Sequence, residues 1–246
     1  ILTLESPVEL LMPGVNQLSF NPQISYQEWY SLFSYNAPDF VVLENPSNAL
    51  MAQLAFELAS STSVLTALTA LDLADGLCTF ISLVRSALRQ ADKMPPSTPL
   101  RTGAPPGTSL EPLVLDSITG MISQRLVRTI CPSCKEVVTV SGQDLEFIRW
   151  LTANEEHVGS FPIYAGKGCQ ECMGTGYSGQ TGIFEVIKFD KNLKQSLFDA
   201  QPLSSFKLRQ FLTDMPVETL KQQGLQKILD GITSLEEIRR ALFTAY

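Results

Sequence analysis

The sequence predicts an α/β protein that continues into a metal-binding subdomain and a helical tail. Three features of the 246-residue chain support this prediction. Short apolar runs alternate with amphipathic stretches in the first third, as in sheets that are built from strand–helix units. Two C-x-x-C motifs then follow, separated by 34 residues, and helical spacing of apolar residues continues to the end of the chain.

The first third reads as alternating strands and helices. Phe40–Leu43 is apolar throughout, as expected of a parallel strand that is buried on both faces. From Asn48 onward, apolar residues recur three and four positions apart, and Asn48 is placed to cap the resulting helix. The complete set of predicted elements in this region is strands over 1–4, 40–43 and 64–68 and helices over 48–60 and 73–88.

Residues 92–112 interrupt this alternation with six prolines, two glycines and several hydroxyl residues. We expect a flexible loop there, because proline and glycine break both helices and strands. A proline-rich ligand for a partner domain is the alternative interpretation. After the loop, residues 113–128 predict a helix that leads into the first cysteine motif.

Four cysteines, Cys131, Cys134, Cys169 and Cys172, make up the two C-x-x-C motifs. Each motif turns two sulfurs toward one point, so the pair of motifs can surround one tetrahedral Zn²⁺ ion. Four thiolates leave no open coordination position, so we predict a structural zinc site and not a catalytic one. Two disulfides or unrelated buried thiols are the alternatives, but nothing in these residues indicates secretion.

The remaining cysteine and the histidine are not expected to bind a metal. Cys78 lies in an apolar run and is expected to be a small core residue. His157 is the only histidine, and we expect it on the surface because the four cysteines already complete a site. In the tail, helices are predicted over 203–212 and 217–229. Gly231 ends the second helix, and a Thr233-x-x-Glu236 capping box opens a last helix over 235–243.

The charge is unevenly distributed. The net charge is −7, yet residues 1–84 contain eight acidic residues and no lysine or arginine. Phosphate and nucleic-acid binding need Lys, Arg or a metal opposite the anion, so this segment is a poor binder of either. The cysteine region is also short of cations, which disfavours a nucleic-acid-binding zinc ribbon. We see no apolar run long enough for a transmembrane segment.

Several stretches resemble the secretion ATPases that drive type II secretion and type IV pilus assembly. Residues 124–135 (QRLVRTICPSCK) and 169–185 resemble the two sides of that family's zinc motif, and residues 224–238 resemble its C-terminal helices. Residues 1–9 (ILTLESPVE) resemble its aspartate box, I-L-T-I-E-D-P-V-E, and residues 38–43 resemble the strand before its Walker B box.

This resemblance implies a partial RecA-like ATPase core with a four-cysteine zinc-binding subdomain and a C-terminal helical subdomain. The predicted domains are the partial RecA-like core at 1–91, the Pro/Gly-rich loop at 92–112, a core helix plus tetracysteine zinc subdomain at 113–190, and a C-terminal helical subdomain at 191–246. Because the sequence opens inside a predicted strand and without Met, we expect it to be part of a longer protein.

The family's nucleotide-site motifs are largely replaced. The P-loop, G-x-x-x-x-G-K-[ST], does not occur in these residues, and the aspartate-box acid is replaced by Ser6, which leaves Glu5. The Walker B box, G-E-I-R-D, faces residues 44–48, where either Glu44 or Asn45 takes the place of the catalytic glutamate. The histidine box faces a segment without histidine. Glu44 and Glu5 are therefore the remaining candidates for catalytic carboxylates.

These replacements favour a subunit that is degenerate in ATP hydrolysis and structural in role. Phosphoryl transfer needs Mg²⁺ ligands, a carboxylate that positions water, and cations on the developing charge. The alternative is an active motor subunit whose P-loop lies upstream of Ile1 and binds ATP with Mg²⁺. The resemblance also implies a cytoplasmic hexamer, peripheral to the inner membrane, whose partners are inner-membrane secretion platform proteins and sibling ATPase subunits; we expect no nucleic-acid partner.

Overall fold

The computed structural model describes residues 1–45, 48–91, 110–140, 142–152, 162–200, 203–213, 215 and 217–243. The chain divides into two compact units. Unit 1 joins residues 1–119 to residues 189–210, and unit 2 joins residues 120–188 to residues 211–246. Each unit is thus assembled from two separate segments, whereas the predicted subdomains are consecutive; those subdomain boundaries remain a prediction.

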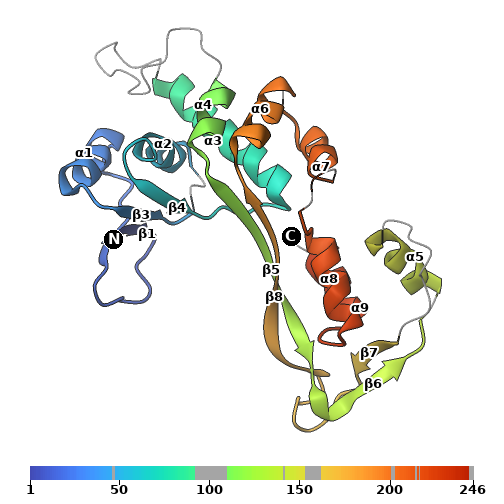
Figure 1. Cartoon of the computed structure of the whole chain (residues 1–246). Helices are drawn as coiled ribbons and strands as arrows, with labels where there is room; N and C mark the ends of the chain where they lie inside the picture. The colour runs from blue at the N-terminus through green and yellow to red at the C-terminus, as the bar shows by residue number, and fades with distance from the viewer. Residues whose placement is uncertain are drawn as a thin grey trace. The chain divides into compact units, whose positions relative to one another are not determined.

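Unit 1 is built on a four-stranded parallel sheet in the order β2-β1-β3-β4 (Figure 1). Thr3 and Leu4 point to opposite faces of β1 and both are buried, so the sheet is covered on both sides there. The strands predicted at 1–4 and 40–43 are confirmed, the third is shifted slightly, and β2 was not predicted. The bounds are β1 (Leu2–Glu5), β2 (Asn16–Ser19), β3 (Phe40–Leu43) and β4 (Ser63–Thr66).

Two helices of unit 1 begin at capping residues that the sequence shows. The side chain of Asn48 accepts a hydrogen bond from the Met51 N–H at 2.9 Å, which confirms the predicted cap of α2. Ser25 and Glu28 form a capping box at the start of α1, which was not predicted. The helices are α1 (Tyr26–Asn36), α2 (Ala49–Leu58), α3 (Leu73–Ala91), α4 (Leu110–Ser117), α6 (Lys191–Asp199) and the first part of α7 (Ser205–Thr213).

The predicted loop at 92–112 is described only in its last three residues. These residues, including Pro112, belong to α4, so the loop ends earlier than predicted. Proline fits there because the first turn of a helix has no N–H bond to lose. Residues 92–109 lie outside the described residues, as does His157.

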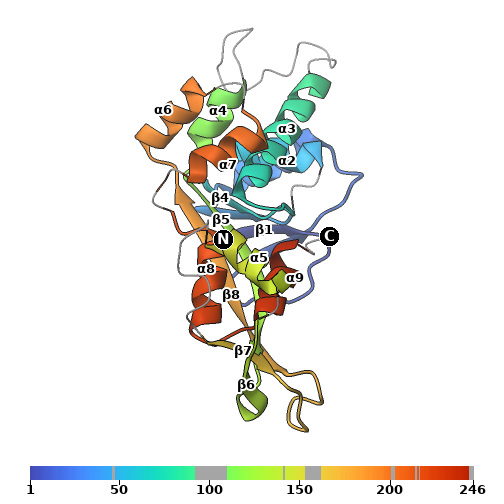
Figure 2. The same cartoon turned by 90° about the vertical axis from the view of Figure 1, so that its right-hand side faces the viewer.

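Unit 2 is a long antiparallel ribbon of β5 and β8, with α8 and α9 packed along it (Figures 1 and 2). Its core brings together one buried aliphatic side chain from each of several elements: Val127, Ile148, Ile183, Ile228 and Ile238. The elements are β5 (Gly120–Ile130), the short 3₁₀ helix η1 (Pro132–Cys134), β6 (Lys135–Val138), α5 (Gly142–Leu151), β7 (Ile163–Gly166), β8 (Tyr177–Lys188), α8 (Leu220–Leu229) and α9 (Leu235–Phe243).

The predicted helix over 113–128 is wrong beyond Ser117. Apolar residues four positions apart suggested a helix, but Gly120 begins a strand that pairs with β8 from Gly120↔Lys188 onward. The predicted capping box is also wrong by one residue. Ser234 caps α9 through its bond from the Glu237 N–H, while the Thr233 hydroxyl donates to a strand carbonyl instead.

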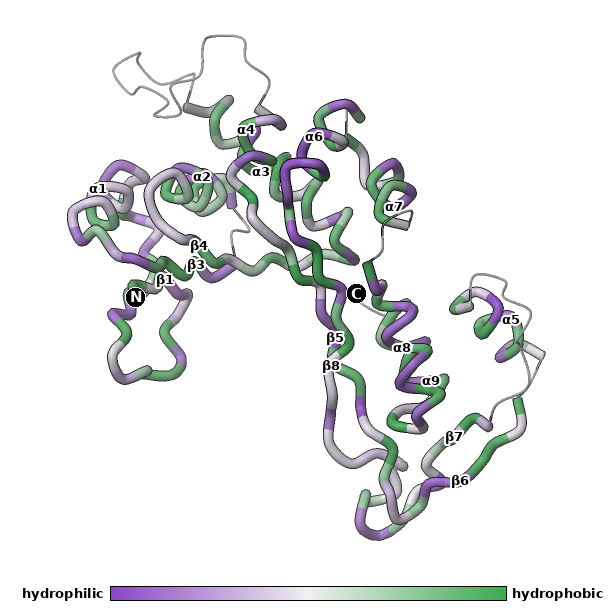
Figure 3. The backbone as a smooth tube through the Cα atoms, in the orientation of Figure 1, coloured by the Kyte–Doolittle hydropathy of each residue, from purple (hydrophilic) through white to green (hydrophobic). Residues whose placement is uncertain are grey.

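Both strands of the β5–β8 ribbon carry hydrophobic residues (Figure 3). One face is buried under the helices, and the other exposes Ile122, Leu126, Phe184 and Val186. The helices in the described part of the chain all fall short of the length and apolarity needed to cross a bilayer.

Candidate metal centre

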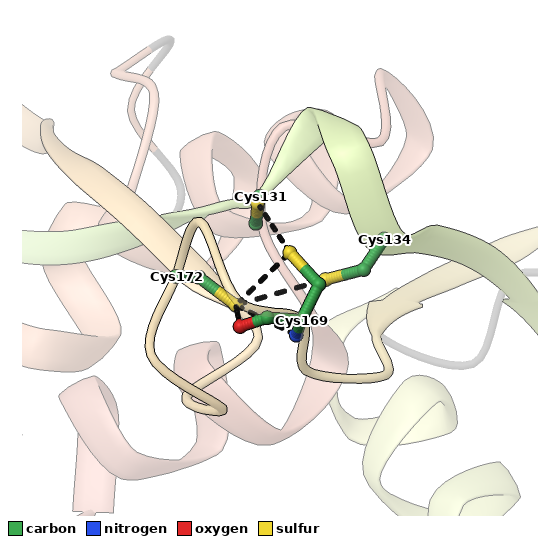
Figure 4. Close-up of side chains that lie close together, drawn as sticks. All are labelled: Cys131, Cys134, Cys169 and Cys172. Atoms are coloured by element: carbon green, nitrogen blue, oxygen red, sulfur yellow. Dashed lines mark hydrogen bonds between the residues drawn. The ribbon is translucent and has the colours of Figure 1, made fainter.

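Four cysteines from two loops of unit 2 converge on one point (Figure 4). Sulfur–sulfur distances are 3.9 Å for Cys131–Cys169, 3.8 Å for Cys134–Cys172 and 3.7 Å for Cys169–Cys172. A tetrahedral Zn²⁺ with bonds of about 2.3 Å places neighbouring sulfurs about 3.8 Å apart. All four are free thiols and lie within 4.8 Å of one another, so this cysteine cluster has the size and donor chemistry of a four-thiolate metal site.

Glycines allow the two ends of the loop that carries Cys169 and Cys172 to approach closely. A Cβ built on Gly166 would lie only 1.9 Å from the carbonyl oxygen of Gly176, so neither position tolerates a larger side chain. Gly176 has a φ of 77°, and its carbonyl accepts a hydrogen bond from the Cys131 N–H at 2.9 Å. The glycine contact closes the second cysteine loop, and the Cys131 hydrogen bond ties the exit of that loop to the entry of the first motif.

The backbone also prepares the cluster for negative charge. The N–H groups of Cys169 and Gly176 both donate to the sulfur of Cys172 at 3.2 Å, and these bonds lower the pKa of that thiol to about 6. Burial has the opposite effect on Cys134 and raises its pKa to about 12. A divalent cation would remove this conflict, because all four ligands bind it as thiolates.

The two candidate catalytic carboxylates lie at the ends of neighbouring parallel strands of unit 1: Glu5 is the last residue of β1, and Glu44 follows β3. Leu4 of β1 lies opposite Leu43 of β3, so Glu5 and Glu44 both stand at the carboxyl edge of the sheet. Ligand sites of parallel sheets lie at this edge. The structure therefore brings the two predicted residues together, although the carboxylate of Glu44 already accepts the Ser6 N–H at 2.5 Å.

The carboxylate of Glu5 accepts hydrogen bonds from neutral side chains of unit 1. The side chains of Thr3 and Gln17 donate to Glu5, at 2.5 and 3.0 Å, and these hydrogen bonds lower the pKa of Glu5. Beyond residue 84, unit 1 does contain cations. Arg209 of α7 forms an ion pair with Asp72 at 2.5 Å, in the segment that faces the family's histidine box.

An open groove of about 660 Å³ lies elsewhere in unit 1, beside β2 and α1. Its lining is mostly apolar, and neither Glu5 nor Glu44 belongs to it. The groove is therefore no evidence for a nucleotide-binding cavity at the carboxyl edge of the sheet. The lining residues are Leu2, Leu11, Met12, Pro13, Val15, Asn16, Gln17, Leu18, Leu32 and Asn36.

Comparison with protein families identifies the chain. Residues 1–240 match the model of the type II/IV secretion system protein family. The chain belongs to this family. The resemblance that the cysteine motifs and the aspartate-box residues indicated is therefore confirmed.

Curated members of the type II/IV secretion system protein family are similar along almost the whole chain. The type IV pilus assembly ATPase PilB of Thermus thermophilus is 29% identical over 240 residues, covering 96% of this chain and 24% of that protein. Type II secretion system ATPase E of Vibrio cholerae is 29% identical over 243 residues, covering 98% of this chain and 42% of that protein. The chain thus spans about a quarter to two fifths of the length of these relatives.

Solved structures support the fold. The Legionella pneumophila ATPase DotB superposes with a TM-score of 0.60 at 14% identity, covering 97% of this chain and 50% of that chain. The pilus retraction motor PilT with bound ADP gives 0.55 at 14% identity, covering 98% and 52%. The predicted α/β fold is confirmed, and the sheet is consistent with a RecA-like core.

One buried charge in unit 2 was not predicted from the sequence. Glu237 of α9 is 0% exposed and bound by Arg128 and Arg240. One signal was available, since Glu237 occupies an apolar-facing position of an amphipathic helix, between Leu235 and Ile238. A charge at such a position needs a partner.

Proposed function

We propose that this chain is the C-terminal region of a traffic ATPase of type II secretion or type IV pilus assembly. We further propose that the cysteine cluster binds a structural Zn²⁺. In this proposal the chain has lost ATP hydrolysis and has a structural role. The names of the relatives support the first part. The donor set and spacing of Cys131, Cys134, Cys169 and Cys172 support zinc.

The side chains at the carboxyl edge of the unit 1 sheet support the proposal that ATP hydrolysis is lost. Among the described residues, Glu44 and Glu5 accept hydrogen bonds from neutral groups: the Ser6 N–H and the Thr3 and Gln17 side chains. Residues 1–84 contain no cation to stabilise transferred phosphate, Ser6 stands where the family has an acid, and in the ungapped register Asn45 stands where the family has its catalytic glutamate. Hydrogen bonds from neutral groups therefore satisfy the carboxylates of this edge, but the edge lacks the groups that phosphoryl transfer uses.

An active motor subunit is the second candidate. It would require a P-loop upstream of Ile1, with Glu44 as the carboxylate that orients water. The position of Glu44 at the end of β3, beside β1, favours this candidate. Zinc has the same structural role under both candidates.

The setting of the chain follows from the family and is part of the proposal. We place it in the cytoplasm, peripheral to the inner membrane, in a hexameric ring that contacts sibling ATPase subunits and inner-membrane platform proteins. ATP and Mg²⁺ would bind only under the second candidate.

Steady-state hydrolysis of Mg·ATP by the full-length protein tests the proposal. We expect no turnover above background, and the same result for Glu44→Ala. Turnover that Glu44→Ala abolishes would overturn the degenerate role and establish the motor subunit. Metal analysis of the same sample should give one zinc per chain.

A further inference from the structure

The turn from α8 into α9 contacts both strands that lead to the cysteine cluster. The contacting residues lie close together in sequence and contribute backbone and side-chain groups. Three of them are buried polar residues, which is unusual in a core and indicates that each has a partner. We name the four residues Ile232, Thr233, Ser234 and Glu237 the tail clamp.

On the β5 side, the tail clamp binds the backbone just before the first cysteine. The pairing of β5 with β8 shifts register between Arg128 and Ile130. There Glu237 accepts the Arg128 N–H at 2.9 Å, and the Thr233 hydroxyl donates to the Arg128 carbonyl at 2.7 Å. The Ile130 N–H donates to the carbonyl of Ile232 at 2.9 Å. The clamp therefore holds β5 at the point where its register with β8 shifts.

On the β8 side, the tail clamp binds the first residue after the second motif's loop. The hydroxyl of Tyr177 lies 2.6 Å from that of Ser234. The ring of Tyr177 lies under the guanidinium of Arg128, 4.1 Å from its centre. The entry and exit strands of the cysteine cluster are thus held by the same short segment.

Glu237 is the charged centre of the clamp. Its side chain is 0% exposed and accepts from Arg128 at 2.6 and 2.9 Å and from Arg240 at 2.6 and 2.9 Å. Two guanidinium groups compensate one buried carboxylate, so removing the carboxylate leaves two facing cations without their shared partner.

We propose that Glu237 is a positioning residue of the metal centre. Through Arg128 it fixes the ends of the strands that present the four thiolates. Metal affinity is thereby linked to the docking of α9. This inference rests on the proposed zinc site. Outer residues that orient metal ligands change affinity by about 10–100-fold when they are replaced. Linkage is reciprocal, so the metal must stabilise the docked α9 by the same factor by which α9 tightens the metal.

Competition between the zinc-loaded full-length protein and a chelator tests the inference. Glu237→Gln keeps the shape of the side chain and removes its charge, and we expect zinc affinity to fall about 10–100-fold. Glu236→Gln is the matched control, because Glu236 is the exposed neighbour on the same helix. Its affinity should equal that of the unmodified protein.

A second variant keeps the test decisive if Glu237→Gln does not fold. Tyr177→Phe removes only the hydroxyl that reaches Ser234, and we expect a fall of about 10-fold, the lower limit for outer residues. Hydrogen exchange should also show faster exchange of α9 amides after zinc removal.

Three results separate the possibilities. A lowered melting temperature with zinc affinity within twofold of the unmodified protein, in both variants, would overturn the inference and leave Glu237 as a stabilising residue only. Unmodified protein without zinc would overturn the zinc proposal itself, and this inference with it. Zinc in the unmodified protein and weaker binding in the variants would support both.

Discussion

The carboxyl edge of the unit 1 sheet and the tail clamp of unit 2 compensate their carboxylates in different ways. At the edge, the donors to Glu5 and Glu44 within the described residues are neutral, and both carboxylates remain at least partly exposed. In the clamp, Glu237 is fully buried and shared by Arg128 and Arg240. An exposed carboxylate can remain without a cation because water solvates it, whereas a buried one cannot.

The difference separates a carboxylate that the fold needs to be paired from carboxylates that solvent can stabilise. We expect substitution of a charge at the exposed edge to change the free energy of unfolding little. Substitution of Glu237 removes the one carboxylate that Arg128 and Arg240 share. We expect experiments to find stability concentrated at the clamp, the cysteine cluster and the apolar core, and little at the edge.

Zinc removal should have the largest effect. Structural zinc contributes folding free energy on the order of 10 kcal/mol, so chelation should unfold the region around the cysteine cluster. Hydrogen exchange should show lost protection in β5 and β8 and retained protection in β1 and β3. An unchanged melting curve after verified metal removal would contradict a structural role.

Apolar burial, and not charge, should hold unit 1. Leu43 is fully buried in β3, so Leu43→Ala should destabilise the unit by about 2–5 kcal/mol. Glu44→Ala, one residue later and exposed, should change stability by less than about 0.5 kcal/mol. Denaturant unfolding measures both. A cost for Glu44→Ala as large as that of Leu43→Ala would remove the distinction between edge and core.

Acid should weaken unit 2 through Glu237. Burial alone raises the pKa of Glu237, but the hydrogen bonds from Arg240 and Arg128 lower it further than that, to about 2 from 4.5. A depressed folded pKa stabilises the protein above pH 4.5, and this stabilisation, about 3 kcal/mol, is lost as the pH falls toward 2.

Urea unfolding of the unmodified protein and of Glu237→Gln measures this loss. The stability difference between them should shrink as the pH falls from 4.5 toward 2, and comparing the two proteins cancels the effect of zinc loss that both share. A difference that is constant with pH would show that the charge of Glu237 is not what stabilises the clamp.

A single methyl group should disturb the contact between the two ends of the loop that carries Cys169 and Cys172. Gly166→Ala places its Cβ against the Gly176 backbone, which cannot rotate away, so we expect a loss of about 1–3 kcal/mol. Gly142→Ala is the control, because a Cβ there meets nothing within 4 Å. Thermal unfolding of the zinc-loaded variants should separate them; equal melting temperatures would count against the close approach.

The parts of the structure that local sequence determines were predicted well. Phe40–Leu43 and the Asn48 cap depend on neighbouring residues, and both are confirmed. The convergence of the four cysteines was also predicted, because two C-x-x-C motifs carry their own turn geometry. The Ser25–Glu28 capping box of α1 was visible in the sequence and was overlooked.

Long-range pairing explains the failures. Residues 120–128 have apolar positions at helical spacing, and only β8, more than fifty residues later, makes them a strand. Glu237 finds the backbone of Arg128 at a separation of 109 residues. No pattern within one segment contains either partner, so both features required the tertiary structure.

The central proposal is that the metal centre was kept while the nucleotide site was lost. Calorimetric titration of the full-length protein with Mg·ATP tests it most directly, when the zinc content of the same sample is also measured. We predict one zinc per chain and no heat of nucleotide binding. Tight Mg·ATP binding would contradict this conclusion, because the remaining parts of the protein would then supply the phosphate-binding groups and the chain would belong to a working motor.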